Sequence, residues 1–473
     1  MKYSESLRRE LAHFQQLVER LQAELDQDHT PGDFRAAVDE LRGGLDEVGR
    51  AAFLSLVSRC DEAAATIAEG TGTVLRCKQT VAKDWLTLWG PVVVWRRVYQ
   101  ADRGGRCWIP LDERCGMVGR YLTPEWERAA AFLGAQLTPT EVEAAMAELL
   151  RQGPSRTAIQ HVLTRVGAAA EHQARALATV LALQAPLKVE EADTLVVGWD
   201  GTTVPLREPA PRRGRPPERP GVGQAEATPT AWREAGVGMV ATYQAGRNAS
   251  APASRREVCY FARMPETKMT ILINQVAQQT AVTLAAGNFP ERVLLADGKR
   301  EIWRAAAACP VFAGFTQIVD FYHATEHLSR AAEALFGKST EAAQRWYQRW
   351  RHKLQHQPGA VVAVQRSLCY YQQHLPQRSI RWREVNLQRG YFRHNQQRMD
   401  YAGYRARGLP IGSGPVEAAC KTIVTQRLKR SGMRWTRTGG QQILNLRVPL
   451  QSHRWQVFWN WYLDYTDQLA IAA

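Results

Sequence analysis

Two aspartates and a glutamate stand where a folded chain would bring them to one metal site. Asp200 and Asp297 each end an apolar, strand-like run, and Glu417 follows the glycine- and proline-rich loop 409–416. Ligands of open α/β sheets bind at the carboxyl ends of strands, so the three side chains are expected to meet there. Because carboxylates held together repel one another at low dielectric, two Mg²⁺ or Mn²⁺ ions would stabilise the cluster. The pattern predicts a two-metal site, although each Asp-Gly dipeptide taken singly is more often just a turn.

The segment behind Glu417 is strongly basic. From Lys421 to Arg437, which is expected to form one helix, it carries six Lys or Arg residues and neither Asp nor Glu. Guanidinium and ammonium groups bind phosphates, and tryptophan stacks on unpaired bases. The residues predicted to hold nucleic acid are Lys421, Arg427, Lys429, Arg430, Arg434, Trp435 and Arg437. A two-metal site beside such a surface is typical of phosphodiester cleavage.

A further polar motif lies at 320–327 and supports two functional interpretations, beside a purely structural one in which the histidines are a pair on a surface helix. In the first, Asp320 and His323 brace the metal site from the end of a neighbouring strand. In the second, His323, Glu326 and His327 form the His-x-x-Glu-His arrangement of inverted zincins, with two zinc ligands on one helix face and a general base. This alternative is a zinc metallopeptidase, but the motif marks no third ligand and leaves the basic segment unexplained.

The composition favours a globular protein with a polyanionic partner. The 473 residues carry 61 Lys and Arg against 46 Asp and Glu, a net charge of +15. Such a charge favours nucleic acid or another polyanion as a partner. The chain shows no secretory leader and no apolar run of about 18 residues, so a cytoplasmic, nucleoid-associated protein that does not enter a membrane is expected.

The eight cysteines are too few for a disulfide framework in a chain of this length. Cys77, Cys107 and Cys115 lie around a glycine-rich turn, but none belongs to a Cys-x-x-Cys pair. Free thiols are therefore favoured over a zinc site, although zinc near Cys77 and Cys107 stays open.

The N-terminal third is expected to be mainly helical, with a region at 1–70, a small β module at 71–122 and a helical domain at 123–190. The first helix carries a heptad seam, formed by Leu7, Leu11, Phe14, Val18, Leu21 and Leu25. Such a seam joins two chains into a homodimer or packs on the chain's own core, and the sequence favours neither. Alternating residues around the Gly90-Pro91 turn predict the strands of the β module within 85–110.

Two helical stretches in the third region fit a helix-turn-helix. They span 139–151 and 155–166 and are joined by a Gly-Pro turn. In that arrangement the second helix enters a DNA groove, with Arg156, Gln160, His161 and Arg165 facing the bases. Because two short helices joined by a glycine turn occur in many helical domains, a purely structural role is the competing interpretation.

From residue 191 onward the chain alternates between strands and helices. Strands are expected at 194–200, 236–243, 257–263, 292–297 and 313–319, with helices at 267–285 and 300–308 between them. A proline- and arginine-rich loop covers 207–222. A helical insertion is expected at about 324–408, and a C-terminal helix at 451–473. The predicted class is α/β, with a mixed sheet under helices at 191–450.

These motifs together resemble one family, the DDE transposases of bacterial insertion sequences, specifically the ISKra type, which is related to Mutator-like elements. The resemblance covers about residues 85–450 and is most specific at 409–417 and 427–435. The matching segments are Gly198–Gly201, Leu295–Trp303, Asp320–Leu328, Leu409–Glu417, Arg427–Trp435 and Asn445–Arg447. The resemblance implies an RNase H-like fold with Asp200, Asp297 and Glu417 as the catalytic triad. Asp320 and His323 match the Asp/Cys-x-x-His element that follows the second acid in Mutator-like enzymes.

The resemblance also implies the reaction. The expected activity is metal-dependent cleavage at the ends of an insertion sequence, followed by strand transfer from the freed 3′-hydroxyl, by a dimer or larger oligomer on double-stranded DNA. An RNase H-like nuclease or resolvase, or a transposase-derived protein that only binds DNA, are the alternatives. One departure concerns Ala101 and Gly104, which stand where relatives carry a Cys-x-x-Cys knuckle.

Overall fold

A computed structural model of the chain describes residues 2–61, 66–68, 74–101, 105, 107–207, 231–246 and 253–472. Two compact units divide these residues. The first consists of residues 1–165 with 459–473, and the second of residues 166–458. Most of the loop expected at 207–222 and Gly104 of the degenerate knuckle lie outside the described residues.

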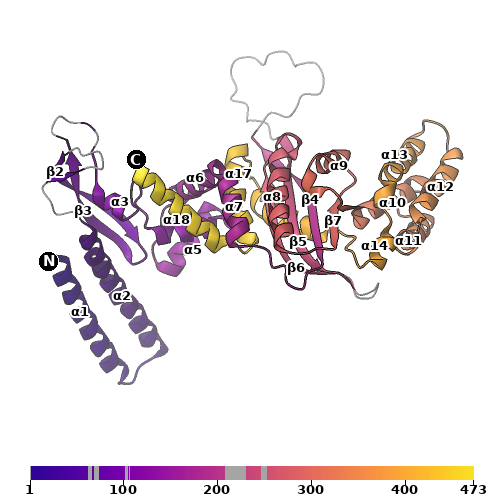
Figure 1. Cartoon of the computed structure of the whole chain (residues 1–473). Coiled ribbons are helices and arrows are strands. Elements are labelled where there is room, and N and C mark those ends of the chain that lie inside the picture. The colour runs from indigo at the N-terminus through magenta and orange to yellow at the C-terminus, as the bar shows by residue number, and fades with distance from the viewer. Residues whose placement is uncertain are drawn as a thin grey trace, which may run out of the picture. The chain divides into compact units, whose positions relative to one another are not determined.

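The first unit begins with a helical hairpin, shown in indigo in Figure 1. Helix α1 (Lys2–Leu25) packs along α2 (Pro31–Cys60). A capping box begins α2, since the Thr30 hydroxyl accepts from the Asp33 N–H while the Asp33 carboxylate accepts from the Thr30 N–H. Leu21 of the heptad seam is buried here, so α1 uses its apolar side against the chain's own second helix. Dimerisation through this seam stays a prediction.

A three-stranded antiparallel sheet forms the β module of this unit. Its strands are β1 (Thr66–Ala68), β2 (Val74–Thr87) and β3 (Gly90–Gln100), in that order. A core under the sheet joins Trp85, Val92 and Val94 to Val57 of α2 and to Leu111 of α3 (Pro110–Arg114). The sequence located the hairpin at Gly90 but began its first strand at Trp85, eleven residues too late.

Short helices complete the first unit. They are α4 (Pro124–Gly134), α5 (Pro139–Leu150), the start of α6 (Arg156–His172) and the end of α18 (Trp455–Ala472). Arg151 ends α5 in the left-handed region, with φ 59°, and the chain turns into α6. The two helices therefore exist at nearly the predicted positions.

A five-stranded mixed sheet forms the centre of the second unit. Its order is β6-β5-β4-β7-β8, in which β4, β5 and β6 are antiparallel neighbours while β7 and β8 run parallel to β4. The strands are β4 (Thr194–Leu206), β5 (Ala231–Gln244), β6 (Ser254–Arg263), β7 (Glu291–Ala296) and β8 (Thr316–Val319). The α/β class and the mixed sheet are confirmed. Asp200 does not end its strand, however, because β4 continues six residues further, paired with β5.

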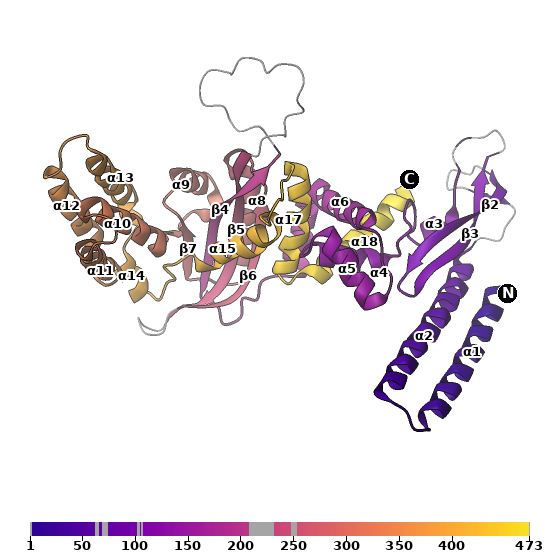
Figure 2. The ribbon, with the colours of Figure 1, turned by 180° about the vertical axis from the view of Figure 1, so that it is seen from behind.

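Helices cover both faces of this sheet. Helix α8 (Thr270–Ala286) lies on one face against β5 and β6, whereas α15 (Gly414–Ala419) and α17 (Arg437–Gln451) lie on the other (Figures 1 and 2). Smaller elements connect these layers: α7 (Ala174–Gln184), η1 (Thr267–Met269), α9 (Arg300–Ala307), η2 (Pro310–Phe312), a π-helix η4 (Cys420–Thr425) and α16 (Gln426–Leu428).

A helical insertion separates β8 from α15 and appears in orange in Figure 1. It contains α10 (Phe321–Phe336), α11 (Glu341–His356), α12 (Ala360–Gln373), α13 (Ile380–Asn395), η3 (Gln396–Arg398) and α14 (Tyr401–Ala406). Its first helix begins three residues earlier than predicted, because Asp320 caps it directly at the end of β8. Among the described residues, the helices are too short or too polar for any to cross a bilayer.

Candidate active site

Asp200 and Asp297 lie side by side on neighbouring parallel strands. The register of β4 against β7 ends with the pair Trp199 and Ala296, so each aspartate is the next residue after that last pair. Burial is the main cause that raises the pKa of Asp200, and the negative charge of Asp297 adds to it, as expected of two carboxylates near each other. The structure thus brings together the first two predicted acids, although in sequence they are far apart.

Asp200 is a largely buried carboxylate without a basic partner among the described side chains. Oδ1 accepts from the Gly201 N–H at 2.7 Å, and Oδ2 accepts from the Cys420 thiol at 3.6 Å. Burial raises the pKa of Asp200, and the backbone hydrogen bond and His323 only partly offset this. A buried acid with two weak neutral donors is a group that a cation would stabilise.

Asp297 instead has a resident counter-ion. Its Oδ1 accepts from the Lys299 N–H at 2.9 Å, and the Lys299 ammonium lies 3.4 Å from Oδ2. The same ammonium donates to Glu234 Oε1 at 2.6 Å. Lys299 therefore holds a fourth acid, Glu234 of β5, beside Asp200 and Asp297. The sequence analysis singled out neither Lys299 nor Glu234. A cleft of about 540 Å³ beside these groups is lined by Asp200, Glu234 and Lys299, together with Arg437.

Glu417 reaches the same region from α15. It lies one helical turn before Cys420, whose thiol contacts Asp200 and whose pKa is raised by burial and by both acids. Its own carboxylate is half exposed and lies 3.3 Å from the Lys421 ammonium. The helix of the third predicted acid thus lies beside Asp200 through Cys420, while the Glu417 carboxylate itself pairs with a lysine.

A π-helix sets the direction of this segment. From Cys420 to Thr425 the backbone winds more widely than an α-helix, a feature that often occurs at functional sites. Arg447 of α17, 2% exposed, donates from Nε to the Ile423 carbonyl at 2.7 Å and from Nη2 to the Thr422 carbonyl. Arg447 therefore supports the turn of helix that carries Cys420 toward Asp200.

The loop before Glu417 is tied to the end of β8. The Phe321 N–H donates to the Ile411 carbonyl at 2.9 Å, and the Ser413 N–H donates to Asp320 Oδ2. At Gly408, φ is 70° and a Cβ would lie 2.3 Å from the Gly246 carbonyl oxygen, so only glycine fits there. The loop thus fixes where α15 begins and hence where Glu417 lies.

Asp320 has a structural position. It is 2% exposed and caps α10 by accepting from the His323 N–H at 2.7 Å, while its other oxygen holds Ser413. Both of its oxygens accept from backbone amides, so it joins α10 to the loop before Glu417, and its role in supporting a metal site stays a prediction. His323 is one-third exposed and lies near enough to Asp200 to lower the pKa of that acid.

The His-x-x-Glu-His motif does not assemble as a zinc site in this structure. The His327 Nδ1 lies 2.6 Å from Gln388 Oε1, and its ring stacks on Tyr391 at 3.5 Å between centroids. Burial lowers the pKa of His327. In the described part of the chain, no three His, Cys, Asp or Glu side chains are grouped so that one ion could bind. No observation favours the metallopeptidase.

The basic segment differs from the single helix expected. Its helix ends at Leu428, and α17 begins only at Arg437. Arg427 is 1% exposed, with its guanidinium 5.4 Å from the centre of the Trp435 ring, so it lies inside the protein in this conformation, and its binding of phosphate stays a prediction. Trp435 is also held, because its indole donates to the Leu428 carbonyl and its backbone pairs with the end of β4. Both residues close the segment against the sheet.

The other basic residues of this segment remain toward the surface. Lys429 donates to the Thr202 hydroxyl at 2.6 Å and is half-buried. Lys421, Arg434 and Arg437 are exposed, and Arg430 is partly so. Arg437 lines the cleft beside Asp200. For these five residues, binding of nucleic acid stays a prediction.

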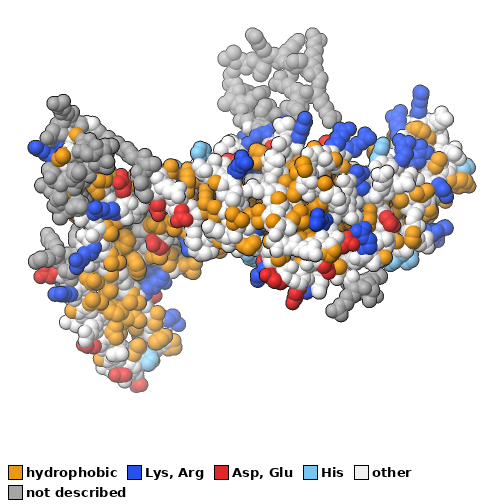
Figure 3. Space-filling view, in the orientation of Figure 1, with side chains coloured by type: hydrophobic (Ala, Val, Ile, Leu, Met, Phe, Trp, Pro, Cys, Tyr) orange, Lys and Arg blue, Asp and Glu red, His pale blue; other side chains and the backbone are white. Residues whose placement is uncertain are grey.

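The sequence analysis missed the charge of the helical insertion. Residues 324–408 contain fifteen Lys and Arg against five Asp and Glu, a net charge of +10 out of +15 for the chain. Figure 3 shows Lys and Arg side chains gathered over α12 and α13. A charge count by segment would have found this surface, because the basic residues are spread along several helices instead of forming one run.

The insertion also contacts the candidate site directly. Tyr391 of α13 packs on Gly298, where a Cβ would lie 2.4 Å from the tyrosine ring. Its hydroxyl is buried without a hydrogen-bond partner among the described groups, and the charges of Asp297 and Asp320 help burial raise its pKa. Tyr391 thus presses on the turn that carries Asp297, which no sequence pattern indicated.

The acids fit divalent magnesium or manganese in kind, since carboxylate oxygens are the hard donors that these ions prefer. Asp200 in particular has only neutral hydrogen-bond donors, so a bound cation would stabilise its ionised form. The described geometry, with Lys299 and Lys421 on the other two acids, does not yet group three donors around one point.

The chain matches none of the protein-family models against which it was scanned, and a search of curated proteins finds no match either.

Proposed function

We propose that this chain is a DDE-type DNA transposase, which cleaves DNA at the ends of an insertion sequence and transfers the freed strand. The observation that carries the proposal is that Asp200 and Asp297 each follow the last paired residues of β4 and β7, while Cys420, one turn after Glu417, contacts Asp200. The order of the sheet supports it. Three antiparallel strands followed by two parallel ones, with acids on the first and fourth strands, is the arrangement expected of an RNase H-like fold.

In this proposal, Asp200, Asp297 and Glu417 hold two divalent cations. When bound, such ions activate water or a 3′-hydroxyl for attack and stabilise the charge on the attacking and leaving oxygens. The chain's own residues supply position and charge. The Cys420 thiol and the Gly201 amide orient the Asp200 carboxylate, and Lys299 restrains Asp297 through its ammonium and backbone N–H.

The basic residues would place the DNA. Lys421, Arg434 and Arg437 lie exposed on the segments that flank the acids, and the insertion adds a larger basic surface. Phosphate contacts of this kind determine affinity and give it a steep dependence on salt. The half-buried Lys429 and partly exposed Arg430 complete this set, whereas Arg427 and Trp435 keep the segment folded.

The proposal is tested by cleavage of a supercoiled plasmid that carries the DNA flanking the gene, in Mg²⁺ or Mn²⁺. We expect nicks at defined ends with the wild-type chain and none with Asp200→Asn, Asp297→Asn or Glu417→Gln. Glu326→Gln is the matched control, because this exposed acid on α10 would be the base of a metallopeptidase but has no part in a transposase. Loss of DNA cleavage in Glu326→Gln alone would overturn the assignment.

Two other outcomes separate the alternatives. Metal-dependent nicks without joined products, even when a target plasmid is present, would indicate an RNase H-like nuclease or resolvase. Tight, salt-dependent DNA binding without cleavage would indicate a descendant that only binds DNA, consistent with the present separation of the acids.

A further inference from the structure

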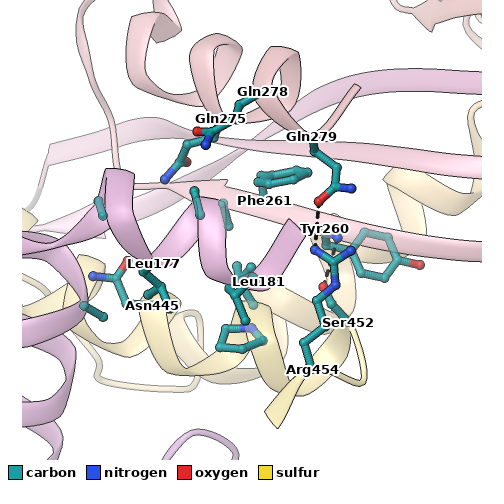
Figure 4. Close-up of a pocket in the computed structure, with 16 residues that line it drawn as sticks. Leu177, Leu181, Tyr260, Phe261, Gln275, Gln278, Gln279, Asn445, Ser452 and Arg454 are labelled. Carbon is teal, nitrogen blue, oxygen red and sulfur yellow. Dashed lines mark hydrogen bonds between the residues drawn. The ribbon is translucent and has the colours of Figure 1, made fainter. Parts of the chain in front are cut away.

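The second unit contains an apolar cavity, away from the acids, beside a buried arginine. The cavity has a volume of about 70 Å³ and lies between α7, α8, β6 and α17 (Figure 4). Leu177, Leu181 and Phe261 give it an apolar lining, and the small side chains of Ala174 and Ala178 leave the space open. Every lining residue belongs to the second unit.

Arg454 stands at one end of this cavity as a buried charge. It is 7% exposed, and its Nη1 donates to Gln279 Oε1 at 2.9 Å. Its Nη2 is buried and has no hydrogen-bond partner among the described groups, and no described carboxylate forms an ion pair with it. A neutral amide offsets only part of the cost of burying a guanidinium, which normally requires an anion.

The nearest titratable group does not supply that anion. Arg454 acts on the thiol of Cys259, but burial is the larger effect and raises the pKa of Cys259 to about 11, so the thiol stays neutral near pH 7. Glu171 is engaged by both terminal nitrogens of Arg263 at 2.7 Å. The described part of the unit thus leaves the guanidinium without an internal counter-ion.

The backbone beside Arg454 is strained. His453, between α17 and α18, has φ 55°, a left-handed conformation that is unfavourable for a non-glycine residue. Arg454 then donates its N–H to the Pro449 carbonyl at 2.8 Å. Strain held at one point next to a buried charge is typical of binding sites.

A second polar group lies at the same end. Ser452 is buried and its oxygen accepts from the Tyr260 N–H at 3.0 Å, which leaves its hydroxyl proton for another acceptor. Figure 4 shows Ser452 and Arg454 close together at one side, with Leu177 and Leu181 on the other. One end of the cavity therefore offers a cation and a hydroxyl, and the rest offers apolar surface.

The cavity continues outward between α7 and α8. A larger groove, of about 700 Å³, shares Ala174, Ala178, Gln275 and Gln278 with it and opens past Thr179 and Ile271. A ligand whose head lies at Arg454 thus has room for an unbranched tail that passes the leucines into this groove.

We propose that this cavity binds a small amphiphilic carboxylate, a medium-chain fatty acid, with its carboxylate on Arg454 and Ser452 and its alkyl chain along Leu177 and Leu181. The proposal does not depend on the transposase activity. The carboxylate of the ligand would be the counter-ion for the buried Arg454 guanidinium. The ligand as a whole would contact α7, the sheet and the turn between α17 and α18.

The test is calorimetric titration of the full chain with octanoate, with octan-1-ol and acetate as controls for tail and head alone. We expect one octanoate per chain. Octan-1-ol should bind at least about tenfold more weakly because it lacks the charged head that Arg454 would bind, and acetate at least about tenfold more weakly because it buries no apolar tail along Leu177 and Leu181. Equal, weak binding of acetate and octanoate, or no heat with octanoate, would overturn the proposal.

Variants then locate the site. Arg454→Met removes the charge at similar volume, and Ala178→Phe fills the cavity while leaving Arg454 intact, so both should abolish octanoate binding. Arg59→Met, an exposed arginine in the first unit, is the matched control and should bind as the wild type does. Unchanged octanoate binding in a folded Ala178→Phe chain would place the ligand elsewhere and refute the site.

Discussion

The thiol of Cys420 lies 3.6 Å from Oδ2 of Asp200, so a helix and a strand that are 220 residues apart in sequence meet at one hydrogen bond. The contact is buried and leaves Asp200 with a neutral donor instead of a cation. Because Cys420 lies one turn after Glu417, the same contact fixes how closely the third acid can approach the first.

The first prediction concerns this thiol. Cys420→Val keeps the volume but removes the donor. We expect cleavage to fall about five- to tenfold, equivalent to about 1 to 1.4 kcal/mol, because a weak thiol donor contributes less than the ~1.5–3 kcal/mol of an ordinary hydrogen bond to a charged group. Cys420→Ser keeps a donor and should retain most activity. The measurement is the single-turnover rate of nicking, and equal rates for the two variants would show that the thiol does not orient Asp200.

The second prediction concerns Asp320, which joins α10 to the loop before Glu417. Asp320→Ala removes a helix cap, worth about 1 kcal/mol, and leaves the Ser413 amide without its partner. We expect a lower thermal midpoint and strongly reduced cleavage, because the loop that places Glu417 loses its anchor.

Thr340→Ala is the control for this prediction. Thr340 caps α11 by accepting from the Ala343 N–H at 3.2 Å, in the insertion and without contact to the loop. It should cost similar stability and leave cleavage unchanged. If both variants lose activity equally, Asp320 acts only through stability.

The strands were predictable because strand periodicity is a local signal. β7 starts one residue from the expected position, and Asp200 and Asp297 each follow the last pair of two buried parallel strands, Trp199 and Ala296. The length of β4 was not predictable, since polar residues after Asp200 read as a turn whereas β5 pairs with them to Leu206. Tertiary pairing extended the strand beyond its sequence pattern.

The roles of the basic residues were the weakest part of the sequence analysis. Charge alone cannot distinguish Arg427, buried over Trp435, from Arg434, which is exposed on the same segment. Arg434 lies in the turn at 429–436, which follows the helix of Arg427. The position of this turn depends on backbone hydrogen bonds between Trp435 and the end of β4, more than 200 residues earlier in the sequence. Tyr391 was missed for the same reason, because its contact with Gly298 is purely tertiary.

The third prediction concerns pH and the metal-free protein. Burial raises the pKa of Asp200 above its ordinary value of 3.8, so in the window just above that value the folded chain binds more protons than the unfolded chain. The contribution of Asp200 to stability must therefore fall as pH rises through this window and stay unfavourable at neutral pH. Asp200→Asn should be more stable than the wild type at pH 7 without metal.

The check is the thermal midpoint of both chains between pH 3 and pH 8 in a chelator. The difference in thermal midpoint between the two chains should vanish at the acid end of this range, where Asp200 is protonated in both the folded and the unfolded state. Adding Mn²⁺ at pH 7 should raise the midpoint of the wild type but not that of Asp200→Asn, if this acid is a metal ligand. A variant less stable than the wild type at neutral pH would contradict the raised pKa.

The fourth prediction separates folding from DNA recognition in α6. Arg165 was predicted to face a DNA groove, but its Nη2 pairs with Glu127, a fully buried acid that Arg120 also approaches at 3.2 Å. Burial raises the pKa of Glu127, and the two arginines oppose that effect. We expect Arg165→Ala to cost about 2 kcal/mol of stability, less than a fully buried pair because Arg165 is partly exposed and Arg120 remains.

Gln160 and His161 are the matched comparison on the same helix. Both side chains are exposed, so Gln160→Ala and His161→Ala should change stability by less than about 0.5 kcal/mol. If α6 reads DNA, these two variants weaken binding to the flanking sequence while non-specific binding is retained. The measurements are urea unfolding and DNA titration of the three variants. A loss of sequence preference in Arg165→Ala alone would show that Arg165 contacts the DNA bases, contrary to this prediction.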